Sequence, residues 1–201
     1  SIAEACAILP RLIELGAEAL ELMDYASLQS VLHVKGIPDI MHRLPIGASA
    51  LLVDFQSDTI LGLDEKINLA QNYIQSLTLL EPCIFTQDPY KQALYWKVRK
   101  GMFPAVGAIR AQGTTVILED VAFPVDQLGS AISDLQELFA KHQYANAIIF
   151  GHAKDGNIHF VVTQKFETEA DTLKYSRFID DVVDLVVHKY DGALKAEHGT
   201  G

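Results

Sequence analysis

Two histidines flank a predicted tight turn in the segment Gly151-His152-Ala153-Lys154-Asp155-Gly156-Asn157-Ile158-His159. Asp-Gly between two strand-like runs is typical of a β-hairpin, because both residues tolerate positive φ. A two-residue or a four-residue loop places His152 directly opposite His159, with Cβ atoms roughly 4.5–5.5 Å apart on one face of the sheet. Two imidazoles at that separation could bind one metal ion. The alternative interpretation is a chance pair of histidines on a solvated strand surface.

A candidate third ligand occurs in the tail, where Glu197-His198-Gly199 offers a carboxylate and another imidazole. Glycine-rich surface segments are the mobile kind that can fold over a site. His152, His159 and Glu197 would be a suitable ligand set for zinc or another divalent ion, with coordination positions left open for a substrate. Sequence spacing does not bring the tail to the hairpin, so a frayed chain end is the alternative interpretation.

The elements that must position these residues follow from apolar periodicity and capping signals. Two ferredoxin-like split βαβ units side by side would fit their order, giving an α+β fold with a mainly antiparallel sheet and helices on one face. The sequence predicts helices over about 2–23, 62–77, 88–101, 124–139 and 167–190, strands over about 48–55, 79–86, 114–123, 144–152 and 157–164, and a loop over 102–113.

The composition is ordinary for a globular protein and argues against several classes of function. The chain has 201 residues, of which 49% are hydrophobic, and a formal net charge of −10. That charge argues against nucleic-acid binding, which needs a basic surface, and against docking on an anionic membrane. No run is long and apolar enough to span a bilayer, and the N-terminal stretch is too charged for a signal peptide, so a cytoplasmic location is the default. Neither a Gly-x-Gly-x-x-Gly sequence nor a Walker-type loop is recognisable.

Four stretches of this chain resemble one family, the C-terminal or cap domains of FAD-linked oxidases, which include D-lactate, glycolate and D-2-hydroxyglutarate dehydrogenases. Segment 151–159 resembles the family motif Gly-His-x-Gly-Asp-Gly-Asn-x-His. The other stretches follow in the family's order: Trp96-Lys97-Val98-Arg99, Glu119-Asp120-Val121-Ala122-Phe123-Pro124 and Glu197-His198-Gly199. The resemblance covers the second half of the chain well. It implies that residues 1–201 are a cap-domain fragment without its flavin-binding domain, which agrees with a chain that stops inside the tail motif.

The resemblance implies oxidation of a small D-2-hydroxy acid to the 2-oxo acid, with hydride transfer to FAD. His152, His159 and Glu197 would hold a divalent metal, usually zinc, that lowers the pKa of the substrate hydroxyl. His198 would be the catalytic base that removes the hydroxyl proton as the hydride leaves. Without the flavin domain, we expect the fragment to bind little or no FAD and to be inactive alone.

The resemblance also implies contacts to the substrate and the flavin. Arg99 would bind the substrate carboxylate, and Asn157 would lie near the ring of FAD, which the missing N-terminal domain mainly holds. The remaining implied partner is an electron acceptor. Arg110 is a candidate second contact to a carboxylate, with an ordinary surface arginine as the alternative.

Four positions depart from the family's pattern. Lys154 replaces a glycine of the hairpin motif. Leu118, Phe103 and Val161 stand where some hydroxyglutarate enzymes have a lysine, a threonine and an asparagine. These departures bear on the identity of the substrate and its second carboxylate, and not on the centre formed by the metal and the histidines.

Two other classes of function also fit the residues. One is a ferredoxin-like regulatory module that binds a metal or another ligand without redox chemistry. The other is a metal-dependent hydrolase in which His152, His159 and Glu197 activate water. A flavin spectrum of the full-length protein would separate the dehydrogenase from both.

Overall fold

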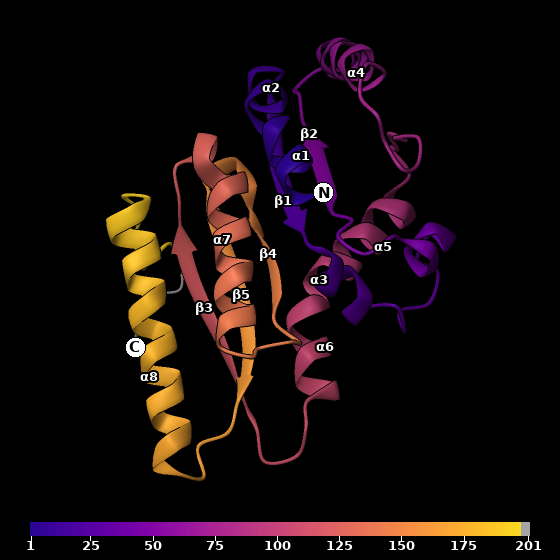
Figure 1. Cartoon of the computed structure of the whole chain (residues 1–201). Coiled ribbons are helices and arrows are strands. Elements are labelled where there is room, and N and C mark those ends of the chain that lie inside the picture. The colour runs from indigo at the N-terminus through magenta and orange to yellow at the C-terminus, as the bar shows by residue number, and fades with distance from the viewer. Residues whose placement is uncertain (198–201) are drawn as a thin grey trace.

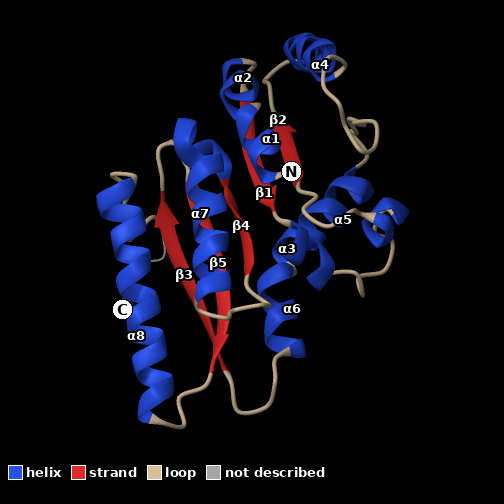
Figure 2. Ribbon diagram, in the orientation of Figure 1, coloured by secondary structure: helices blue, strands red, loops and turns tan. Residues whose placement is uncertain are grey.

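One five-stranded sheet lies at the centre of the fold (Figures 1 and 2), and the structure, a computed structural model, describes residues 1–197. The strand order is β2-β1-β4-β5-β3, and every neighbouring pair is antiparallel. The predicted α+β class with a mainly antiparallel sheet is therefore confirmed. The strands are β1 (Ala17–Met23), β2 (Ala50–Phe55), β3 (Thr115–Ala122), β4 (Ile148–His152) and β5 (Asn157–Gln164).

Capping residues determine where several helices begin. The Asp88 carboxylate accepts a hydrogen bond from the Tyr90 amide, with Pro89 at the first position of α5. Thr168 and Asp171 form a capping box at the start of α8. The α-helices are α1 (Ile2–Ala7), α2 (Leu9–Glu14), α3 (Tyr25–Ser30), α4 (Ile60–Ile74), α5 (Pro89–Lys100), α6 (Met102–Ile109), α7 (Leu128–Lys141) and α8 (Glu169–Val183). Short 3-10 turns cover Asp39–Arg43, Val125–Gln127 and Ala153–Asp155, and a π-helical turn covers Asp184–Lys189.

Helices cover both faces of the sheet, because the central strands are apolar on both sides. On one face, Ile149 and Phe160 pack with α1, α2, α7 and α8 around the fully buried Phe178. On the other face, Phe150 and Val161 pack with α3, α5 and α6. Successive residues of a strand point to opposite faces, so these two clusters lie on opposite sides of β4 and β5. The sequence predicted helices on one face of the sheet, but the structure has α1, α2, α7 and α8 on one face and α3, α5 and α6 on the other.

The second half of the chain forms a split βαβ unit, in which α7 connects β3 to β4 and β5 lies between these two strands. The first half adds the antiparallel pair β1 and β2 to the same sheet. Residues 79–86, predicted as a strand, lie in an irregular segment, and residues 102–109, predicted as a loop, form α6. The structure therefore contains one split unit extended by two strands, instead of the two units predicted.

The N-terminal segment differs most from its prediction. Apolar spacing predicted a helix over 2–23, but Gly16, with φ of +84°, ends the helical region and the chain continues as β1. Burial favours the strand, because Leu20 and Leu22 enter the core on one face of the sheet. The alternation then places Glu21 on the opposite face.

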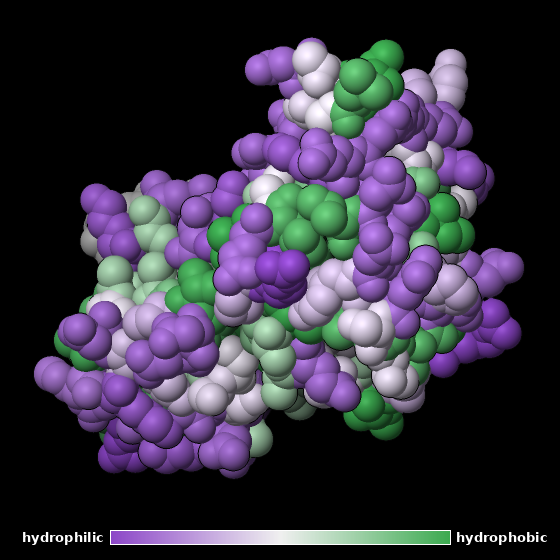
Figure 3. Space-filling view, turned by 90° about the horizontal axis from the view of Figure 1, so that it is seen from above, coloured by the Kyte–Doolittle hydropathy of each residue, from purple (hydrophilic) through white to green (hydrophobic). Residues whose placement is uncertain are grey.

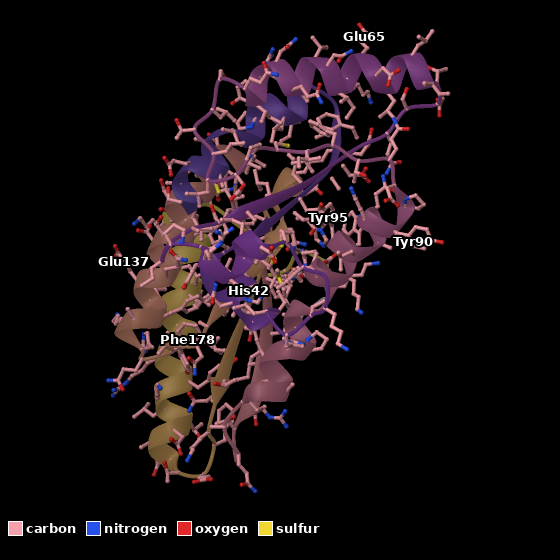
Figure 4. All side chains as sticks on the ribbon, turned by 90° about the vertical axis from the view of Figure 1, so that its right-hand side faces the viewer. His42, Glu65, Tyr90, Tyr95, Glu137 and Phe178 are labelled. Atoms are coloured by element: carbon pink, nitrogen blue, oxygen red, sulfur yellow. The ribbon has the colours of Figure 1, made fainter. Side chains whose placement is uncertain are left out.

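Helix α4 lies at the upper end of the molecule in Figure 1 and begins with two exposed apolar residues. Ile60 and Leu61 are 79% and 83% exposed. The surface seen from above is mainly hydrophilic, with several separate hydrophobic patches (Figure 3). Glu65 on α4 and Tyr90 on α5 point away from the body of the molecule (Figure 4). Within residues 1–197, no helix has the length and apolarity needed to cross a membrane.

Candidate metal centre

The turn between β4 and β5 sets how the two histidines meet. The loop takes up residues 153–156, one position earlier than the predicted four-residue loop, and Gly156 has φ of +68°. Phe150, and not His152, is therefore opposite His159, so the predicted register is wrong by two residues. A shift of two keeps both histidines on one face, because the side chains of a strand alternate with a period of two. The centroids of the two imidazoles are 5.4 Å apart.

His152, His159 and Glu197 bring three potential ligand atoms together. Glu197 Oε1 is 3.2 Å from His152 Nε2 and 2.9 Å from His159 Nε2. The three ligand atoms lie within 4.8 Å of one another. The side chains of His152 and Glu197 are 37% and 44% exposed, so a small molecule can reach this group from one side.

A further carboxylate lies next to the Nδ1 atom of each histidine. Glu21 Oε1 is 2.6 Å from His152 Nδ1, and Asp120 Oδ1 is 3.3 Å from His159 Nδ1. A proton held on Nδ1 by such a carboxylate leaves the lone pair on Nε2, which is the tautomer that metal binding through Nε2 requires. Two imidazoles and a carboxylate with this support fit a divalent metal ion.

Strand β3 anchors the tail that carries Glu197. Asp120 Oδ2 accepts hydrogen bonds from the amides of Ala196 and Glu197, at 3.1 and 2.6 Å. Ala193 also pairs with Ala122 in an isolated β-bridge. Up to Glu197, the tail is therefore a bound segment and not a frayed end.

Arg99 lies beside the three ligands. Its Nε donates a hydrogen bond to Glu21 Oε2 at 2.7 Å, in an ion pair whose side chains are 9% and 4% exposed. The guanidinium carbon is 4.6 Å from the centroid of the Phe150 ring, a cation–π contact. Among the described residues, the two terminal nitrogens of Arg99 make no hydrogen bond, which leaves them available for an anion.

Burial and neighbouring charges shift the pKa values of the site. The hydrogen bond with Glu21 raises the pKa of His152, although burial opposes this shift. Burial lowers the pKa of His159 against the attraction of nearby carboxylates. Burial alone would raise the pKa of Glu21, but the hydrogen bond with His152 and the charge of Arg99 hold it below its ordinary value. The lowered pKa of His159 favours the neutral imidazole that a metal needs, whereas the raised pKa of His152 keeps that ring protonated to higher pH.

Two other predicted site residues occupy different positions. Asn157 begins β5 and is 7% exposed, and its Oδ1 has no hydrogen-bond partner among the described residues. Arg110 follows α6 and donates hydrogen bonds to the backbone oxygens of Gly107 and Thr114, at 2.6 and 3.1 Å. Thr114 directly precedes β3, and the extended chain from Thr114 to Asp120 spans about 20 Å at 3.3 Å per residue. The structure therefore does not bring Arg110 to the three ligands.

His198, the predicted base, lies outside the described residues. Glu21 and Asp120 contact the histidines directly, but the sequence analysis assigned them no role. A signal for Glu21 was present in Leu20-Glu21-Leu22, where a charged residue lies between two apolar residues in the segment that follows Gly16. Asp120 likewise alternates with a core residue of β3 and faces the histidine side of the sheet.

Comparisons with known proteins agree with this architecture. The family "FAD linked oxidases, C-terminal domain" matches residues 1–201. Glycolate oxidase subunit GlcD of Bacillus subtilis is 22% identical over 158 residues, which are 79% of this chain and 32% of that protein. D-lactate dehydrogenase (cytochrome) 1, mitochondrial, of Saccharomyces cerevisiae is 26% identical over 141 residues, 67% of this chain and 23% of that protein. D-2-hydroxyglutarate dehydrogenase of Xanthomonas citri pv. viticola is 24% identical over 120 residues, 59% of this chain and 24% of that protein.

This chain spans about a quarter to a third of the length of these relatives. Among solved structures, an alkyldihydroxyacetonephosphate synthase has a TM-score of 0.56 and 13% identity, and the match covers 96% of this chain and 37% of that one. That likeness supports the fold alone. The family match covers every residue, and the relatives are named as dehydrogenases and oxidases. The chain therefore belongs to the C-terminal domain family of the FAD-linked oxidases, a family of enzymes.

Proposed function

We propose that this chain is the substrate-side cap of an FAD-dependent dehydrogenase that oxidises a small D-2-hydroxy acid to the 2-oxo acid. It would act with an N-terminal flavin domain of the same protein, which holds most of the FAD, and with an electron acceptor that reoxidises the flavin. The observation that carries the proposal is the convergence of His152, His159 and Glu197 beside Arg99. A cation site next to a guanidinium suits a substrate whose hydroxyl and carboxylate oxygens lie on adjacent carbons.

The proposed metal ligands are His152 Nε2, His159 Nε2 and a carboxylate oxygen of Glu197, whose donor types suit zinc. When bound, the ion would supply Lewis acidity that lowers the pKa of the substrate hydroxyl. Glu21 and Asp120 would keep the two imidazoles in the ligating tautomer.

The side chains of this domain would bind and orient the substrate and accept its proton. Arg99 would bind the carboxylate through its two terminal nitrogens and so orient C2 of the acid. His198 is the proposed base: it would take the hydroxyl proton as the C–O bond becomes a carbonyl, and FAD, when bound, would supply the acceptor for the hydride of C2. The hydride would carry two electrons, so the acid would be oxidised at the expense of a bound flavin. Asn157 is the proposed neighbour of the flavin ring.

Apolar side chains near Arg99 favour a substrate with a short, uncharged side chain. Phe150 contacts the guanidinium, and Leu118 and Val161 belong to the same apolar cluster. Neither of these two side chains can pair with a second carboxylate, and Arg110 is held at the other end of β3. We therefore propose a monocarboxylic acid of the D-lactate type as the substrate, in preference to D-2-hydroxyglutarate.

Anaerobic mixing of the full-length protein with a panel of D-2-hydroxy acids tests the proposal, with flavin absorbance as the readout. We expect D-lactate-type acids to bleach the flavin band, and His198→Ala or a metal chelator to abolish the bleaching. A bound flavin that no acid reduces would contradict the proposed chemistry. A protein without flavin that binds a metal would favour the regulatory module, and hydrolysis without an electron acceptor would favour the hydrolase.

Two arginine variants test the carboxylate contact against a matched control. Arg99→Lys removes a bidentate contact to a charged group, which contributes about 1.5–3 kcal/mol, so kcat/KM is expected to fall about 10- to 100-fold. Arg110→Lys changes an exposed arginine whose hydrogen bonds, among the described residues, go to backbone oxygens, and kcat/KM should change less than about twofold. Equal effects of the two variants would contradict the assignment of Arg99 as the residue that binds the substrate carboxylate.

A further inference from the structure

The Glu21 carboxylate connects two parts of the site. Its Oε1 is 2.6 Å from His152 Nδ1, and its Oε2 is 2.7 Å from Arg99 Nε. Glu21 is 3% exposed and is paired with His152 in the register of β1 and β4. Among the residues that the structure describes, each oxygen has one hydrogen-bond partner, so a single buried side chain contacts the imidazole and the guanidinium at the same time.

We propose that Glu21 is a positioning residue that sets the tautomer of His152 and the orientation of Arg99 together, so that the metal-binding and carboxylate-binding groups form one unit. The proposal rests on the proposed function, which assigns the roles of those two residues. Burial makes the arrangement specific, because a carboxylate removed from water is stable only when charged or hydrogen-bonding partners compensate it.

The first consequence concerns the imidazole. With Nδ1 donating to Glu21 Oε1, the neutral His152 ring keeps its lone pair on Nε2, the atom that faces Glu197. Without that acceptor, the ring can also hold its proton on Nε2, and this second form does not bind a metal there. Loss of such a carboxylate behind a ligating histidine lowers metal affinity by about 10- to 100-fold.

The second consequence concerns the guanidinium. Arg99 is bound to Glu21 through Nε, and Phe150 contacts its guanidinium group. Glu21 therefore takes one nitrogen of the planar group and leaves the two terminal nitrogens for a substrate carboxylate, which can bind them in a bidentate manner. Without Glu21, the cation–π contact with Phe150 remains, but it does not fix the rotation of the plane.

Three variants test whether Glu21 must contact both His152 and Arg99, whether its negative charge alone suffices, and whether any substitution of a strand glutamate has the same effect. Glu21→Gln keeps the shape but replaces one acceptor oxygen with an NH2 donor. Glu21→Asp keeps the charge but is one methylene shorter, so it cannot reach both partners. Glu119→Gln is the matched control, because Glu119 lies on the opposite face of the sheet and accepts one hydrogen bond, from Tyr175 at 2.9 Å.

Two measurements on the purified protein test the proposal. Titration with cobalt(II), followed by visible absorbance, should show affinity about 10- to 100-fold weaker in both Glu21 variants and unchanged in Glu119→Gln. Nitrogen-15 NMR of the metal-free protein at alkaline pH should show His152 protonated on Nδ1 and a protected Nε–H signal of Arg99. We expect the two Glu21 variants to lose both NMR signatures.

Unchanged NMR signatures in both Glu21 variants would overturn the proposal, even if the wild type binds cobalt. Wild-type behaviour of Glu21→Asp in both measurements would also overturn it, because negative charge alone would then suffice. A wild type that binds no cobalt would contradict the proposed metal ligands, and the NMR signatures would still decide the role of Glu21.

Discussion

Replacement of Asp120 by asparagine tests how the sheet supports the candidate metal centre. Asp120 Oδ1 is 3.3 Å from His159 Nδ1, and Oδ2 accepts the amides of Ala196 and Glu197. Asparagine has the same shape but only one acceptor oxygen. If that oxygen stays with the two amides, its NH2 group faces Nδ1 and favours the tautomer of His159 that is protonated on Nε2. That tautomer cannot ligate a metal through Nε2.

The expected magnitude follows from these contacts. Loss of the supporting carboxylate should weaken zinc binding about 10- to 100-fold, or about 1.4–2.7 kcal/mol. Asp120→Ala should weaken it further, because the tail that carries Glu197 also loses two hydrogen bonds to a charged acceptor, each contributing about 1.5–3 kcal/mol.

Competition with a chromophoric chelator measures the zinc Kd of the wild type and of both Asp120 variants. Asp134→Asn is the control, since Asp134 lies on α7 and pairs with Lys189 at 2.6 Å. Thermal denaturation of each metal-free variant establishes that the fold is retained. Zinc binding by Asp120→Asn within about threefold of the wild type would refute the reasoning about the tautomer and the tail.

Three further predictions concern pH and packing. Metal affinity should rise as the pH rises through the raised pKa of His152, because the ring must release a proton to bind the ion, and calorimetry at several pH values should detect that proton. The same raised pKa stabilises the metal-free fold below pH 6.5. This contribution to the free energy of unfolding is lost as the pH rises through the folded-state pKa of His152. Gly156→Ala would place a Cβ 1.9 Å from a backbone oxygen at φ +68°, so urea denaturation should show a larger loss of unfolding free energy than for Gly47→Ala. The control position has φ +83° but open space around it, and its variant should lose about 1–2 kcal/mol. Equal losses would show that the close contact at Gly156 relaxes. Phe178→Ala should cost about 3–5 kcal/mol in the same assay because the ring is fully buried, whereas Phe166→Ala, at a ring 44% exposed, should cost much less.

Local sequence signals predicted several elements near the site correctly. The predicted limits of β5, Asn157–Gln164, agree with the structure, and α5 starts after Asp88 and ends before Gly101 as predicted. Caps and turns act over a few residues, so the sequence displays them directly. Where local signals competed, packing decided: residues 17–23 have helical spacing, yet they form β1 because the sheet buries Leu20 and Leu22.

The sequence by itself determined which ligand types are present and that His152 and His159 share a face of the sheet, because the period of a strand is a local property. Only the tertiary structure decided their partners. Glu21 is 131 residues from His152 in the chain and becomes its neighbour because β1 pairs with β4, and Asp120 reaches His159 because β3 pairs with β5. The order of strands in a sheet results from packing of the whole chain, and residue spacing along one segment does not encode it.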